Sequence, residues 1–167
     1  MLYEGGIRVP LIVRWPGHVE PGSVTSNPVI GTDFYTTLAE IAGVELASDH
    51  ILDGSSFVSV LTGTGEVEPR DLIWHFPAYL EADRSVSDPW RTTPASALRR
   101  GKFKLIHFFE DGHSELYDLT EDVSESNDLS LKMPEVTAEL QAGLMAWWKE
   151  TQAFVPSEPN PSYRPSG

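Results

Sequence analysis

Residues 3–17 read YEGGIRVPLIVRWPG, and they are the most informative part of this chain. The glycine pair lets the backbone turn where a side chain would clash. Glu4 and Arg8 flank that turn with opposite charges, and we expect both to be structural. The apolar run that follows, ended by Pro16-Gly17, predicts a buried strand over residues 9–15. Such a strand needs neighbours, and the chain offers few candidates to lie beside it.

Two helices are predicted after this strand. Thr32 followed by Asp33 is typical of a helix start and Gly43 of a helix end, so we expect a helix over residues 33–42. Its apolar residues Phe34, Leu38, Ile41 and Ala42 repeat at helical spacing on one face. We expect residues 9–15 and the outer side of this helix to leave an exposed apolar patch. Residues 53–56, DGSS, predict a turn into a second, shorter helix. We interpret Asp33 and Asp53 as caps of backbone amides and not as metal ligands.

The second half of the chain alternates short apolar runs with tight turns. Four strands are predicted, at residues 72–76, 95–99, 103–108 and 115–119. The turns at 100–101 and 110–113 are short, which requires antiparallel pairing in a four-stranded meander. Lys102 and Lys104 alternate with apolar neighbours, so we expect both to point away from the core.

A final helix should cover one face of this sheet. Pro134 and Glu135 suit a first helical turn. An apolar stripe follows, made of Val136, Leu140, Leu144, Trp147 and Trp148. We expect one of the two tryptophans to pack and the other to lie at the edge. The resulting fold class is α+β.

Composition excludes several classes of function. A net charge of −13 disfavours nucleic acids and anionic membrane surfaces, because both repel an acidic protein. The chain has no cysteine, which excludes disulfides, thiolate catalysis and zinc–thiolate sites. No apolar run is long enough to span a membrane, and the residues after Met1 show no leader pattern, so the localisation stays undecided.

Several of these segments resemble the sulfatase family of the alkaline-phosphatase-like superfamily. Residues 3–17 are similar to its Y-E-G-G-x-R-V-P block, which precedes an apolar strand and W-P-G. Residues 97–106, ALRRGKFKLI, resemble its a-x-R-x-G-d-y-K-L-i hairpin, and residues 115–119 its E-L-Y-D-L strand. The family's next turn is echoed by Asp122, Glu125, Asn127 and Leu129, with Val123 in place of a proline and Asp128 inserted. The resemblance covers residues 3–153 and matches only the C-terminal portion of a sulfatase.

This resemblance implies the C-terminal part of an alkaline-phosphatase-like α/β fold, with a four-stranded antiparallel sheet packed against a C-terminal helix. Residues 1–66 would be the end of the sulfatase catalytic α/β domain. Residues 67–155 would form the sheet-plus-helix subdomain, and residues 156–167 a disordered or extended tail.

The resemblance also implies a chemistry whose parts lie elsewhere. Sulfatases hydrolyse sulfate esters with a formylglycine residue and a calcium ion, and the nucleophile and most metal ligands precede the Y-E-G-G block. A sulfate-binding lysine lies about four residues before its tyrosine, a position that falls before Met1 here. We therefore assign no catalytic residue and no metal ligand to this chain. His107 and His113 flank a hairpin, lack a third ligand at metal spacing and are expected to be exposed.

Two residues are candidates for substrate binding. His75, in WHFP, resembles a loop of related bacterial sulfatases; the alternative is a strand-end histidine bonded within the subdomain. Arg91 can pair with sulfate or carboxylate in a forked geometry, or form a surface salt bridge. Residues 87–91, SDPWR, fit the S-x-P-x-R pattern of formylglycine formation. We interpret them as a chance match, because Pro94 prevents the helix that follows in the family.

The leading hypothesis is a C-terminal fragment of a sulfatase, inactive alone. The intact parent would act on sulfated saccharides or aryl sulfates, with calcium and formylglycine supplied by its missing N-terminal catalytic half, and would be periplasmic or secreted. One alternative is a fragment of a related phosphatase or phosphodiesterase, which the upstream nucleophile would distinguish. The other is a non-catalytic carbohydrate-binding module, for which Trp90 is the one loop tryptophan that would suit a sugar.

Overall fold

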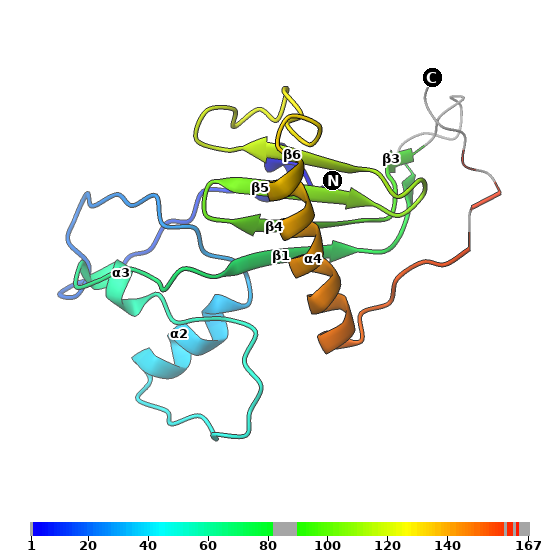
Figure 1. The fold of residues 1–167 in the computed structure, drawn as a ribbon. Helices are drawn as coiled ribbons and strands as arrows, with labels where there is room; N and C mark the ends of the chain where they lie inside the picture. The colour runs from blue at the N-terminus through cyan, green and yellow to red at the C-terminus, as the bar shows by residue number, and fades with distance from the viewer. Residues whose placement is uncertain (1, 82–89, 159, 162, 164–167) are drawn as a thin grey trace. The chain divides into compact units, whose positions relative to one another are not determined.

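A computed structural model describes residues 2–81, 90–158, 160, 161 and 163, and it divides the chain into two compact units (Figure 1). The sheet unit comprises Met1–Val9 and Arg70–Gly167, and the helical unit comprises Pro10–Pro69. The first residues of the chain therefore belong to the same unit as its second half. No helix in the described residues is both long and apolar enough to cross a membrane.

The sheet unit is built on four antiparallel strands. They are β1 Asp71–Phe76, β4 Ala95–Arg100, β5 Phe103–Phe108 and β6 Ser114–Asp118, in the order β1-β4-β5-β6. Gly101 and Gly112 have positive φ angles of 58° and 74°, which glycine adopts without strain in the tight turns beside β5. The predicted meander is confirmed.

A second, two-stranded sheet was not foreseen. It pairs β2 Leu80–Glu81 with β3 Trp90–Thr92. Both strands are too short to carry an alternating pattern, which is why the sequence gives no signal for them.

Helix α4, Pro134–Thr151, packs on one face of the four-stranded sheet, as predicted (Figure 1). Its two buried leucines join a cluster made of Leu98, Leu105, Leu116, Leu140 and Leu144. Arg100 ties the helix to β1 through ion pairs with Asp71 (2.6 Å) and Glu139 (2.8 Å). Both tryptophans are half-buried, and Trp148 is the one that packs against the leucine cluster.

The other face of the sheet has its own core. The cluster there contains Leu2, Ala95, Ala97, Ile106, Tyr117 and Leu119. Alternation along β4 and β5 explains the division, because successive side chains point to opposite faces. Helix α1, Glu4–Ile7, is a single turn where the sequence predicted only a bend, and the segment that carries it supplies Leu2 to this cluster.

The helical unit contains α2, Asp33–Ile41, and α3, Val58–Thr62, which confirms both predicted helices. The apolar side of α2 is the exposed one. Its buried residues are polar, namely Asp33, Thr36 and Thr37, whereas Phe34, Leu38 and Ile41 are exposed.

Hydrogen bonds explain why the polar face of α2 turns inward. Asp33 Oδ2 accepts from the Ile30 amide (2.8 Å) and Oδ1 from the Ser55 amide (3.0 Å), so the predicted capping role is confirmed. Thr37 Oγ1 accepts from the Phe57 amide (3.1 Å). Asp53 instead contributes its backbone carbonyl, which accepts from Thr32 Oγ1 (3.5 Å).

The predicted strand over residues 9–15 is absent. These residues belong to no helix or strand, and in the described part of the chain the amides of residues 9 and 11–14 donate to no backbone carbonyl. Ile12 is 90% exposed. A strand requires an adjacent strand for its hydrogen bonds, and the described residues do not supply one here.

We expect Leu144→Ala to lower the free energy of unfolding by about 2–5 kcal/mol, because it opens a cavity in the cluster beneath α4. The matched control is Met145→Ala, one residue along the helix and exposed, with an expected change within about 0.5 kcal/mol. Urea unfolding followed by tryptophan fluorescence measures both variants. Equal effects of the two substitutions would contradict the packing described for α4.

Candidate functional site

His75 lies on β1 with both ring nitrogens hydrogen-bonded. Nε2 lies 2.9 Å from the Phe154 carbonyl oxygen, and Nδ1 lies 2.5 Å from Ser96 Oγ. A carbonyl can only accept, so Nε2 carries the proton and Nδ1 accepts from the Ser96 hydroxyl. The indole nitrogen of Trp148 donates to the same Ser96 oxygen (3.1 Å). Every polar group in this network is therefore satisfied with a neutral imidazole.

The surroundings of His75 are aromatic. Its ring makes edge contacts with Phe109 and Trp147, at centroid distances of 5.9 and 5.8 Å. Through the Phe154 carbonyl, His75 also fixes the chain just after α4. To bind a substrate oxygen, Nε2 of His75 would first have to lose its hydrogen bond to the Phe154 carbonyl oxygen.

Arg91 lies on β3 with an exposed side chain. Next to it, the Trp90 ring contacts Tyr79 at a centroid distance of 4.8 Å. An exposed guanidinium beside aromatic side chains can bind an anionic sugar ring. His75 and Arg91 lie on different sheets, and no contact joins them among the described side chains. Residues 87–89 of the S-x-P-x-R match lie outside the described residues.

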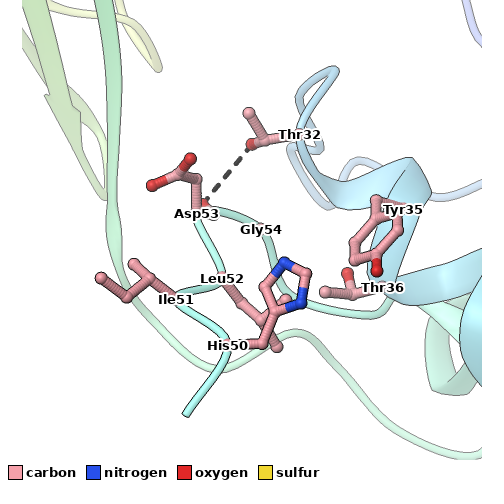
Figure 2. A pocket seen from close by; sticks show the side chains of 8 residues that line it. All are labelled: Thr32, Tyr35, Thr36, His50, Ile51, Leu52, Asp53 and Gly54. Carbon is pink, nitrogen blue, oxygen red and sulfur yellow. Dashed lines mark hydrogen bonds between the residues drawn. The ribbon is translucent and has the colours of Figure 1, made fainter. Parts of the chain in front are cut away.

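A shallow pocket of about 220 Å³ lies in the helical unit (Figure 2). It is lined by Thr32, Tyr35, Thr36, His50, Ile51, Leu52, Asp53 and Gly54. Gly54 is required there, because a Cβ atom would lie 2.2 Å from the Thr32 carbonyl oxygen. Figure 2 shows the Asp53 carboxylate turned away from the His50 imidazole, so the pocket has hydroxyl groups and one imidazole but no acid–base pair. No sequence motif signalled it.

A buried ion cluster lies on the sheet face opposite α4. Lys104 is fully buried, and its Nζ lies 3.0 Å from Glu4 Oε1 and 2.8 Å from Glu125 Oε1. The first contact is a hydrogen bond, whereas the second is an ion pair without hydrogen-bond alignment. Glu4 also pairs with Arg8 (3.4 Å), in keeping with the structural role expected for both.

The expected exposure of Lys104 is therefore wrong. Alternation does place the Lys104 side chain on the other face of the sheet from Leu105. Residues 2–7 cover that face, however, and the sequence pattern could not reveal this. For Lys102 the expectation is confirmed, because its side chain is 52% exposed and pairs with Asp118 (2.6 Å).

Two phenols and one carboxylate lie beside this cluster. Tyr3 and Tyr117 both donate to Glu115 Oε2, at 2.6 and 3.0 Å. Burial and the Glu115 charge raise the pKa of both hydroxyl groups, so they remain protonated donors. This arrangement binds the Tyr3 segment to β6 and provides no nucleophile.

The two hairpin histidines differ in their surroundings. His113 is half-exposed and hydrogen-bonds to Asp111, as a surface residue would. His107 is buried, contrary to expectation, because its ring packs against Trp148 and Phe109. Burial, with a smaller effect of the His113 charge, lowers the pKa of His107. No group of three His, Asp or Glu side chains in the described residues is arranged to hold a metal ion.

Comparison with known proteins identifies the chain. Residues 1–150 match the family model described as N-sulphoglucosamine sulphohydrolase, C-terminal. The chain belongs to the sulfatase family. A sulfatase of Formosa agariphila is 36% identical over 160 residues, which cover 87% of this chain and 28% of that protein. Arylsulfatase A of Bos taurus is 34% identical over 184 residues, covering 93% of this chain and 34% of the bovine protein.

The fold agrees with this membership. A solved structure described as a complex with its substrate D-glucosamine-2-N,6-O-disulfate superposes with a TM-score of 0.64 and 27% identity, over 84% of this chain and 28% of that one. The matches fall in the C-terminal portions of sulfatases with the alkaline-phosphatase-like fold. The chain spans about a third or less of the length of these relatives.

We expect the stability of the sheet unit to fall as the pH drops from about 7 to 5. The folded-state pKa of His107 lies below its ordinary value of about 6.5, so the unfolded state binds more protons in this range. One such group changes the unfolding free energy by at most about 1.4 kcal/mol per pH unit. Urea titrations at several pH values measure this slope.

His107→Gln should flatten that dependence, because glutamine does not titrate. His18→Gln, at an exposed histidine, is the control and should leave the slope unchanged. The same slope in the parent chain and in His107→Gln would show that the buried imidazole does not cause it.

Proposed function

We propose that this chain is the C-terminal part of a sulfatase that hydrolyses sulfate monoesters of saccharides or aryl alcohols. The observation that carries the proposal is the match of residues 1–150 to the C-terminal model of N-sulphoglucosamine sulphohydrolase. Relatives named sulfatase and arylsulfatase A support the same reaction class.

In this proposal the reactive centre lies in the part of the sulfatase that this chain does not cover. Calcium and formylglycine would belong to that part, where the ion would supply a charge for polarising the sulfate and formylglycine would supply the nucleophile. The described residues of this chain contribute support and substrate contacts. The chain alone is then without turnover.

The partner of the chain is the remainder of the sulfatase, and the helical unit carries the surface for it. Phe34, Leu38 and Ile41 of α2 expose apolar side chains, and residues 11–13 form an apolar run that pairs with no strand in the described part of the chain. A run that is apolar on both faces is typical of a strand buried inside a parallel sheet. These residues would gain their missing neighbours in the intact protein.

Arg91 and His75 are the proposed substrate contacts. Arg91 is the more direct of the two, because its guanidinium is exposed and can form paired hydrogen bonds with a sulfate or carboxylate. His75 would contribute its Nε2 proton after release of the Phe154 carbonyl. A structural relative bound to a disulfated glucosamine favours a saccharide as the substrate.

The reaction is tested with a fusion in which this chain replaces the aligned C-terminal part of the Formosa agariphila sulfatase. We expect the fusion to hydrolyse a chromogenic aryl sulfate in the presence of calcium at least about tenfold faster than the truncated relative. The isolated 167-residue chain should show no turnover. Calcium-dependent turnover by the isolated chain would place the active site within it and overturn the proposal.

In the same fusion, Arg91→Ala should raise the KM for a sulfated saccharide by roughly 10- to 100-fold, which corresponds to loss of about 1.5–3 kcal/mol from a charged hydrogen bond. Arg91→Lys should restore the KM only in part, because an ammonium cannot pair with two oxygens in a fork. Lys149→Ala, at an exposed position of α4, is the control. An unchanged KM in Arg91→Ala would show that Arg91 does not contact the substrate.

A further inference from the structure

We propose that Lys104 is a positioning residue whose buried ammonium group holds residues 2–8 on the sheet unit. It thereby fixes the path along which the sulfatase chain enters its C-terminal sheet. The anchoring of residues 2–8 concerns this chain alone, whereas the path of the sulfatase chain rests on the proposed function.

The connectivity makes this contact important. Residues 2–9 belong to the sheet unit, the chain then leaves it for the whole of Pro10–Pro69, and it returns at Arg70. The N-terminal segment therefore joins the sheet by side-chain contacts and not by strand pairing. Helix α1 has only four residues and cannot be stable by itself.

Three residues hold the segment, and their contacts differ in strength. Leu2 packs into the apolar cluster, and Tyr3 donates to Glu115 at an exposed site. Glu4 is the third and is bound twice: its amide donates to Glu125 Oε2 (2.5 Å), and its carboxylate accepts from Lys104 (3.0 Å). Charged hydrogen bonds in a buried site are the strongest of these interactions.

Lys104 is the centre of this arrangement because it balances two buried carboxylates. The side chain of Glu4 is 6% exposed and that of Glu125 is 2% exposed. Without the ammonium group the two carboxylates would face each other in a site that excludes water, which is strongly unfavourable. Movement of the segment that carries Glu4 into solvent relieves this repulsion without unfolding the sheet.

Glu4→Gln tests the proposal while leaving the ion pair of Lys104 with Glu125 in place. Hydrogen exchange followed by mass spectrometry reads the amides of Gly6, Ile7 and Arg8, which bond to Tyr3 and Glu4 carbonyl oxygens in the native chain. We expect their exchange to accelerate at least tenfold in Glu4→Gln and in Lys104→Met. Amides of β4 and β5 should remain protected in Glu4→Gln. Trypsin should also cleave after Arg8 faster in both variants.

Two controls separate positioning from general stability. Lys102→Met removes an exposed lysine from the same hairpin and should leave residues 2–8 protected. The triple variant Lys104→Met, Glu4→Gln and Glu125→Gln removes all three charges and should recover protection relative to Lys104→Met. The proposal is overturned if Glu4→Gln leaves exchange at residues 6–8 unchanged, or if these amides already exchange freely in the unmodified chain. Both readouts are independent of sulfatase activity, so they decide this point even if the fusion is inactive.

Discussion

The buried ammonium group of Lys104 is the constraint on which the closure of one face of the sheet depends. A charge that is removed from water must be paired, and here the partners come from opposite directions along the chain, Glu4 and Glu125. Glu125 adopts a positive φ of 54°, an unfavourable conformation for glutamate. The ion pair of its carboxylate with Lys104 explains why a glutamate occupies this position. The second face of the sheet therefore closes only when both segments are in place.

The two faces of the sheet illustrate two ways of covering a surface. Helix α4 covers one face with leucines, which need only the right volume and spacing. The N-terminal segment covers the other with a small apolar cluster and a set of directed polar contacts, including Tyr3 to Glu115. Directed contacts specify a single register for the N-terminal segment on this face.

The helical unit is held together in a different way. Its interior is organised by the Asp33 carboxylate and two threonine hydroxyl groups, while the apolar side of α2 is exposed. This distribution suits a piece of a larger protein, and it agrees with the short span of the chain within its sulfatase relatives. In the sheet unit, His75 has both ring nitrogens bound internally, so its chemistry depends on the segment after α4. Of the two proposed substrate contacts, Arg91 is the one whose charge faces solvent.

The sequence by itself determined the four-stranded meander, helix α4 and the family, because hydrophobic periodicity, turn glycines and short motifs are local signals. It also located the capping role of Asp33. Only the tertiary structure decided that Lys104 and His107 are buried, that α2 turns its polar side inward and that residues 9–15 are unpaired. Each of these depends on which segment covers a given face. The segment that covers a face is chosen by contacts between residues far apart in the chain, such as the pair Glu4 and Lys104. Alternation within a single strand carries no information about which segment this is.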